Sequence, residues 1–313
     1  MLGKTAGGVF WMFRYLERSE NISRLLDAGF RIALTRSSAA ESEWASVIAT
    51  AGVKQIYEEK YDQYDAPEVI DFLLRDRDNP SSVLSVIDDS RNNARLVRTA
   101  LTREVWEATN ECWITLKALL TRPTRARELP EMLSTVRQQS ALVRGALHGT
   151  MLRNDIYDFA RLGTFLERAD NTARILDVKY YVLLPSASFI GSSMDNVQWE
   201  TILRSVSAQS AYRWRHQGDF SPVSIAEFLI LSRQLPRSLA FCYSKIMDNL
   251  NYLEEDYEAR HPCHDLGGNI RARLKQRSIE SIFDDGLHEF ITEFIRDNIA
   301  LGNQIEKDYR FIG

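Results

Sequence analysis

Apolar residues recur every three or four positions through most of the chain, the spacing that places them on one face of an α-helix. The pattern predicts helices over residues 6–35, 40–60, 82–120, 131–150, 154–184, 195–215, 222–231, 236–260 and 267–306. Only 8 prolines and 15 glycines occur in 313 residues, and so few favour long helices over a turn-rich β architecture. We therefore expect an all-α fold.

A polar twelve-residue motif occurs twice within the predicted helices. It reads LERSENISRLLD over residues 16–27 and LERADNTARILD over residues 166–177, with seven identical positions at an offset of 150. Further matches follow in the same order, Trp44 with Trp199 at an offset of 155 and Pro80 with Pro236 at 156. An ordered series of matches with a slowly drifting offset indicates a tandem duplication.

The repeat suggests one compact unit made of three segments. These are a first helical repeat over residues 1–130, a connecting helix and loop over 131–155, and a second helical repeat over 156–313. Duplicated halves often pack about a pseudo-twofold axis, as homodimers pack about a true one. The helices at 6–35 and 154–184 would then meet near the centre of an internally duplicated bundle, with their polar motifs together.

The polar side chains of each motif form a narrow stripe on one helix face. At 3.6 residues per turn, Glu17, Asn21 and Arg24 lie along one line. The second copy places three equivalent residues in the same line: Glu167, Asn171 and Arg174. Arginine keeps its charge when partly buried and offers five donors in a rigid fork, which suits recognition of carboxylate or phosphate.

The stripes have two interpretations. The first is a pocket for an anionic amino-acid or peptide group, in which Glu17 or Glu167 is the catalytic acid or base. Its substrate-binding residues would come from both motif helices: Arg14, Arg18, Asn21, Arg24, Arg168, Asn171 and Arg174. The second is a buried Glu–Arg–Asn network that fixes the register of two helices and carries no chemistry.

A second group of arginines occurs in the first half alone. Arg91, Arg95 and Arg98 are spaced to share one face of the predicted 82–120 helix. The positions 156 residues later hold other residue types: Met247, Asn251 and Glu254. We expect the three arginines to bind substrate as well, so that the helix over 82–107 lines one asymmetric pocket. A solvated arginine face is the alternative.

Composition narrows the classes of function. The formal net charge of -4 provides no general attraction to nucleic acid or anionic membrane, so neither is an expected partner. Three cysteines, Cys112, Cys242 and Cys263, form no CxxC pair and are predicted to be free thiols in a reducing compartment. No apolar run reaches the roughly 18 to 20 residues that cross a bilayer. The apolar patch at 9–13 is too short for a signal peptide, and the charged residues Arg14 and Glu17 follow it closely. We expect a cytoplasmic protein.

Familiar cofactor and metal motifs are missing. The chain has no GxGxxG or GxxxxGK[ST] loop for a nucleotide. His261, Cys263 and His264 cluster in an expected loop, but a fourth ligand for a zinc-type site is not evident. The sequence therefore predicts no cofactor and no metal site.

Several of these segments resemble the bacterial Alpha-E domain family. In the first half the likeness rests on FWMFRYLERSENISRLLD at 10–27, NPSSVLS at 79–85, SRNNARLVR at 90–98 and EVWE at 104–107. In the second half it rests on FLERADNTARILD at 165–177 and FLILSRQLPRS at 228–238. The resemblance covers nearly the whole chain and implies an all-α protein.

The resemblance also implies partners. Genes of the family commonly neighbour those for a circularly permuted ATP-grasp ligase, a transglutaminase-like peptidase homologue and sometimes a proteasome-like peptidase. It thereby implies a helical component of a system that makes or modifies peptide or amide bonds, with the ATP-grasp ligase and the transglutaminase-like protein as partners. Three roles stay open: a catalytic subunit, a non-catalytic subunit that binds substrate, and a structural adaptor. A solvent-reachable cavity lined by both stripes would favour a site, and a dry, fully paired cluster would favour the network.

Overall fold

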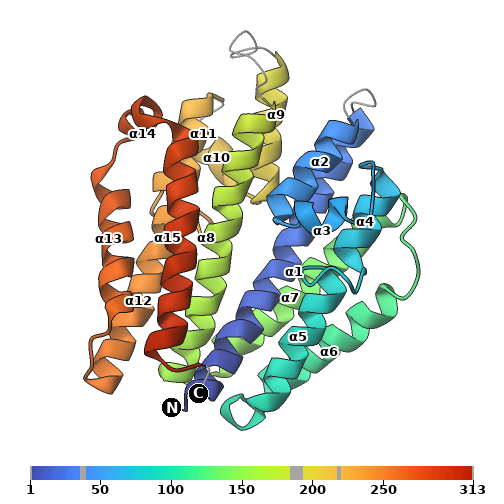
Figure 1. Ribbon diagram of the computed structural model, residues 1–313. Helices are drawn as coiled ribbons and strands as arrows, with labels where there is room; N and C mark the ends of the chain where they lie inside the picture. Colours follow the sequence, from blue (N-terminus) through green and yellow to red (C-terminus); the bar gives the residue numbers. More distant parts are fainter. Residues whose placement is uncertain (1, 36–39, 184–192, 217–219, 312–313) are drawn as a thin grey trace.

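The computed structural model describes residues 2–35, 40–183, 193–216 and 220–311, and within these ranges every regular element is helical (Figure 1). The first elements are α1 (Gly3–Thr35), α2 (Ala40–Ala51), α3 (Lys54–Glu58), α4 (Ala66–Leu74), α5 (Val83–Leu96), the 3₁₀ turn η2 (Arg98–Ala100), α6 (Arg103–Leu119) and α7 (Leu129–Thr150). The later elements are α8 (Asp155–Leu183), α9 (Ser193–Ser205), α10 (Gln209–His216), α11 (Pro222–Leu231), α12 (Leu239–Tyr257), α13 (Pro262–Gln276), α14 (Ile279–Asp285) and α15 (Leu287–Asp308). The predicted all-α class is confirmed.

Helices α1 and α8 lie side by side in the middle of the molecule. α1 packs against α5 and α7, with α6 against both, while α8 packs against α12 and α15, with α13 against both. Figure 1 shows the first group on one side and the second on the other, with both chain termini at the same end. The two motif helices are thus neighbours, as the sequence predicts. The matching contacts agree with a duplication, which itself stays a prediction.

α5 and α12 begin in the same way. The hydroxyl of Ser82 accepts a hydrogen bond from the backbone N–H of Ser85 at 3.2 Å, and the hydroxyl of Ser238 accepts one from the N–H of Phe241 at 3.1 Å. A serine at the N-cap satisfies an N–H group that the first turn of a helix leaves unpaired. The prolines of the two Pro-x-Ser segments therefore lie in the turn before each helix.

Four predicted helices are each divided in the structure: residues 40–60, 82–120, 195–215 and 267–306. Breaks fall where the backbone has positive φ, at Gly52 (72°), Ser207 (54°) and Gly286 (99°). Elsewhere a turn holds a buried apolar side chain, such as Val97 between α5 and η2. Such side chains continue the apolar pattern across the turn, so periodicity alone predicts a longer helix than the one that forms.

The backbones of α1 and α8 approach closely at Gly163. A Cβ atom at this position would lie 2.2 Å from the carbonyl oxygen of Phe10, so a side chain fits only if the helices move apart. Phe10 is fully buried in the core that continues across both groups of helices. Glu167 lies one helical turn after Gly163, and the close approach therefore brings the polar stripes within reach of each other.

We expect Gly163→Ala to lower the free energy of unfolding by roughly 1–3 kcal/mol, because the added methyl group meets backbone atoms of α1. Gly145→Ala in α7 is the matched control, since a Cβ there has no atom within 4 Å. Alanine is also the better helix former, so the control variant should gain up to about 1 kcal/mol. Urea unfolding of both variants measures the difference. Equal stabilities would contradict the close packing of α1 on α8.

Candidate functional site

Two pairs of charged residues cross between α1 and α8. Arg168 donates to both oxygens of Glu17, from Nε at 2.9 Å and from Nη2 at 2.8 Å. Arg18 donates to both oxygens of Glu167, from Nε at 2.5 Å and from Nη2 at 3.0 Å. Both glutamates are buried. Each motif glutamate is therefore held by the arginine that follows the glutamate of the other copy, a reciprocal exchange with the bidentate geometry that arginine favours.

A further arginine joins the cluster around Glu17. Arg237, which lies in the turn before α12, forms an ion pair with Glu17 at 3.0 Å. It also donates to the Oδ1 of Asn21 at 2.9 Å and to Glu20 at 2.8 Å. Arg144 on α7 forms a second ion pair with Glu20. The sequence prediction omits Glu20, Arg144 and Arg237. The repeated Pro-x-Ser segment around Arg237 could have pointed to that arginine, whereas Arg144 lies outside every repeated motif.

The remaining motif arginines also bind carboxylates. Arg14 donates to Glu167 at 3.1 Å, and its guanidinium lies 4.7 Å from the ring centroid of Trp11. Arg24 and Arg174 each bind the acidic residue one turn earlier on their own helix, at 3.1 Å and 2.6 Å. The structure therefore brings every arginine predicted from the two motifs into one buried or half-buried cluster.

The electrostatics favour ionised glutamates. Burial alone would raise the pKa of the Glu167 carboxyl. The positive charges of Arg18 and Arg14 outweigh this effect of burial and lower the pKa to about 2. The pKa of Glu17 is also lowered, because Arg168 and Arg237 outweigh the same effect of burial. A general acid or base works best with a pKa near the operating pH. Both carboxylates are engaged on both oxygens, so the geometry favours ion pairing over the predicted proton transfer.

The arginines predicted from the 82–120 segment lie elsewhere. The guanidinium of Arg91 lies 4.0 Å from the ring centroid of Trp113, and that of Arg98 lies 5.1 Å from the ring centroid of Trp106. Arg95 is exposed. Because Arg91 and Arg98 lie against tryptophans of α6, these arginines do not meet the motif residues, contrary to the single asymmetric pocket expected from the sequence.

A cavity of about 190 Å³ opens between the two stripes. Its lining comes from α1, α8, the end of α2 and the turn before α5: Arg18, Asn21, Ile22, Leu25, Thr50, Ala51, Gly52, Ser81, Glu167, Asp170, Asn171 and Arg174. Asn21 and Asn171 are only 3% and 7% exposed, and the Nδ2 of each has no hydrogen-bond partner within the described part of the chain. A buried donor left unpaired costs about 1–3 kcal/mol. Both asparagines belong to the lining of this cavity, which makes it the candidate ligand site.

The two sides of the cluster differ at a position of the Pro-x-Ser segments. At the repeat offset of 156, Ser81 corresponds to Arg237. Arg237 fills the space beside Asn21, where it donates to the Oδ1 of that residue. Ser81 has a short side chain and lines the cavity, as does Asn171. The cavity thus lies where the first half has a serine in place of an arginine.

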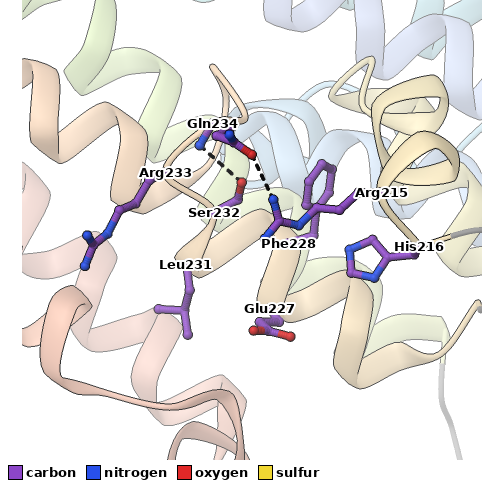
Figure 2. A pocket seen from close by; sticks show the side chains of 8 residues that line it. All are labelled: Arg215, His216, Glu227, Phe228, Leu231, Ser232, Arg233 and Gln234. Carbon is purple, nitrogen blue, oxygen red and sulfur yellow. Dashed lines mark hydrogen bonds between the residues drawn. The ribbon is translucent and has the colours of Figure 1, made fainter.

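A larger cavity of about 600 Å³ lies between α10 and the end of α11 (Figure 2). Arg215 donates to Gln234 there at 2.8 Å, while Arg233 points away from the other charged side chains. Binding sites for small molecules present a few polar groups that converge on the ligand. Because these groups diverge, we assign no site to this cavity.

The segment around His264 is structural. Within the described ranges, no three His, Cys, Asp or Glu side chains are placed to hold a metal ion. The Nδ1 of His264 accepts from the N–H of His261 at 3.0 Å, and its Nε2 donates to the carbonyl oxygen of Leu250 at 3.0 Å. The prediction of a loop around Pro262 is wrong, because α13 begins at this residue. A proline is favourable at the first position of a helix, where the N–H group that it lacks would have no partner within the helix.

Among the described helices, none has the length and apolar character needed to cross a membrane.

Comparison with known proteins gives one family. The Alpha-E model, described as a predicted alpha-helical domain with a conserved ER motif, matches residues 1–310. An uncharacterized protein of Mycobacterium bovis and one of Mycobacterium tuberculosis are each 22% identical to the chain over 304 residues. The match covers 92% of this chain and 34% of each relative, so the chain spans about a third of the length of the curated relatives it matches. No solved structure matches the chain significantly.

The ion pairs of Glu167 should make stability depend on pH. This carboxyl has an ordinary pKa of 4.5 and a folded pKa of about 2, so its contribution is complete above pH 4.5 and is lost as the pH falls through 2. The difference corresponds to roughly 3 kcal/mol. We expect the gap in unfolding free energy between the wild type and Glu167→Gln to shrink by about this amount between pH 5 and pH 2, measured by urea unfolding.

The exposed pair of Arg103 and Glu107 provides the control for this titration. Glu107→Gln should change stability little at any pH, because solvent screens an exposed ion pair. A gap that stays constant for Glu167→Gln from pH 5 to pH 2 would contradict the low pKa.

Proposed function

The chain belongs to the Alpha-E family, and from this premise we propose that it is a non-catalytic binding component of a bacterial system that makes or modifies peptide or amide bonds. The cavity between the stripes takes the carboxylate of an amino acid or peptide. An ATP-grasp ligase supplies the bond-forming chemistry, and a transglutaminase-like protein is the second partner. The observation that carries the proposal is the pair of unpartnered amide donors, Asn21 and Asn171, in a cavity lined by both stripes.

The charges around the cavity support an anionic ligand. The cluster contains seven arginines, Arg14, Arg18, Arg24, Arg144, Arg168, Arg174 and Arg237, and four carboxylates, Glu17, Glu20, Glu167 and Asp170. This leaves an excess of three positive charges in a region largely screened from water. A carboxylate would reduce that excess while it accepts hydrogen bonds from Asn21 and Asn171.

The size of the cavity limits the ligand. A volume of about 190 Å³ provides room for a small polar group and several water molecules. That space accommodates the end of an amino acid or peptide and lies below the roughly 300–1,000 Å³ of pockets that enclose a whole small molecule. The lining includes the hydroxyls of Ser81 and Thr50, but the hydroxyl of Thr50 donates to the carbonyl of Ser46 at 2.8 Å. Binding is therefore the role that the lining supports, rather than nucleophilic catalysis.

A structural adaptor is the second candidate, and a separate observation favours it. On the side of Arg237, the carboxylates of Glu17 and Glu20 are fully occupied by arginines. Breaking a buried pair by removing one partner costs about 3–5 kcal/mol, so such a cluster also serves to fix helix register. The two candidates differ in one respect: only the binding function requires the cavity to be open.

Ser81→Arg tests the proposal directly. An arginine at this position would fill the cavity and reach Asp170, as Arg237 reaches Glu20 on the other side. We expect this variant to bind the probe N-acetylglycine at least about tenfold more weakly than the wild type, a loss of about 1.4 kcal/mol or more. Its melting temperature should stay the same or rise. Isothermal titration calorimetry and thermal unfolding provide the two readouts.

Ser81→Ala is the matched control, because it keeps the cavity open and should bind the probe like the wild type. The neutral analogue N-acetylglycinamide should bind more weakly than N-acetylglycine to both. Equal affinity of the wild type and Ser81→Arg for the probe would refute the binding site and leave the adaptor. Co-purification of the full chain with the ATP-grasp ligase and the transglutaminase-like protein tests the proposed partners separately.

A further inference from the structure

A second polar cavity lies at the opposite end of α8, away from the motif. It has a volume of about 360 Å³ and is formed by the start of α8, the residues before it, and α12. Its lining is rich in charged and aromatic side chains, among them Arg153, Tyr157, Asp158, Arg161, Lys245 and Tyr252. None of these belongs to the stripes, so the cavity does not depend on the function proposed above.

Asp158 is an isolated carboxyl in this cavity. It is 5% exposed, and its side chain has no hydrogen bond or ion pair among the described residues. Burial raises its pKa to about 7, and the like charges of Asp256 and Asp155 act in the same direction. A buried carboxyl without a partner is unfavourable for the fold. A cationic group of a ligand would relieve that cost.

Arg161 is the complementary group. It lies three residues after Asp158 on α8, a spacing at which opposite charges on a helix commonly pair. No ion pair or hydrogen bond of its guanidinium occurs in the described ranges. The guanidinium instead lies 4.4 Å from the ring centroid of Phe165. Its pKa is lowered by burial, and the charges of Arg168 and Arg153 add to this effect. Arg161 therefore presents an unneutralised cation to the same cavity.

The other charges of the lining do not satisfy this pair. Lys245 is engaged by Asp248 at 2.8 Å. Arg153 donates to the backbone carbonyl of His148 at 2.6 Å, and its guanidinium lies 4.0 Å from the ring centroid of Tyr157. Glu255 and Asp256 are exposed carboxylates of the lining. The cavity thus offers one buried carboxyl and one guanidinium that lack a partner among the described residues, held on the same helix one turn apart.

We propose that this cavity binds a zwitterionic ligand of the amino-acid class, with the ligand ammonium on Asp158 and the ligand carboxylate on Arg161. The ammonium and the carboxylate of an α-amino acid are attached to one carbon, so a single molecule can bridge two opposite charges that do not pair directly. Tyr157 and Tyr252 provide aromatic walls for its side chain. A group with one charge alone would leave either Asp158 or Arg161 unpaired.

The experiment uses the full chain and matched probes. Each of the twenty free L-amino acids is titrated calorimetrically at concentrations up to about 10 mM, which detects affinities near the millimolar limit of useful binding. The amino acid that binds most tightly is then compared with its decarboxylated amine and its deaminated acid. We expect both analogues to bind at least about tenfold more weakly, since each lacks one of the two charge-assisted contacts.

Variants distinguish a ligand site from a structural role. Asp158→Asn and Arg161→Gln should each weaken binding of the amino acid at least about tenfold. Asp158→Asn should also raise the melting temperature at pH 8, because it removes a buried charge that faces Asp155 and Asp256. Asp284→Asn and Arg122→Gln are the matched controls, because they make the same chemical changes at exposed residues outside the lining of the cavity. Ser81→Arg should leave this binding unchanged.

Several outcomes would overturn the proposal. Absence of binding by all twenty amino acids would exclude an amino-acid site, as would a deaminated acid or an amine that binds as tightly as the zwitterion. Binding that survives both Asp158→Asn and Arg161→Gln would place the ligand elsewhere. A lower melting temperature for Asp158→Asn with unchanged affinity would show that Asp158 serves the fold. A result at this cavity is independent of the N-acetylglycine measurements on the stripes.

Discussion

Two ion pairs between α1 and α8, Glu17 with Arg168 and Glu167 with Arg18, are the interaction on which the rest of the architecture depends. Each carboxylate is buried, and a buried charge without a partner costs several kcal/mol. The partner of each glutamate comes from the other helix, so neither α1 nor α8 can satisfy its own motif. A shift of one residue between the helices would separate both pairs at once. The pairs therefore fix the register of α1 on α8, and the close approach at Gly163 fixes their distance.

The proposed binding function rests on the difference between the two sides of this cluster. On one side, Arg237 reaches Glu17, Glu20 and Asn21, and the carboxylates there have no capacity left for a ligand. On the other side the corresponding residue is Ser81, and a cavity remains next to an asparagine whose amide group is unpartnered. A paired network and an open cavity are usually alternatives. Here they occupy opposite sides of one cluster, and the side with the cavity has Ser81 where the other side has Arg237.

Much of the fold could be predicted because it rests on local patterns. Apolar periodicity predicts the helices, and the two copies of the motif predict that α1 and α8 meet. The division of α5 from α6 could not be predicted, because buried Val97 preserves the periodic pattern through the turn. In the candidate site, the motif residues Glu17, Arg18, Glu167 and Arg168 could be identified from the sequence. Arg144 could not, because its contact with Glu20 joins residues 124 positions apart and follows no repeat. Asp158 and Arg161 belong to no motif. They stand out only because their side chains lack partners among the described residues, which the sequence does not reveal.

The two cavities are connected by the charge of the central cluster. α8 carries both, with Asp158 and Asn171 separated by a length of helix of about 20 Å. Between them lies Arg168, whose charge acts on Arg161 and helps to lower its pKa. The excess positive charge of the cluster therefore has two effects. It makes the space between the stripes favourable for a carboxylate, and it opposes the charge of Arg161 in the second cavity, which the carboxylate of a ligand would compensate. The cluster that holds the two helices together thus favours an anionic group in the first proposed site and at Arg161 in the second.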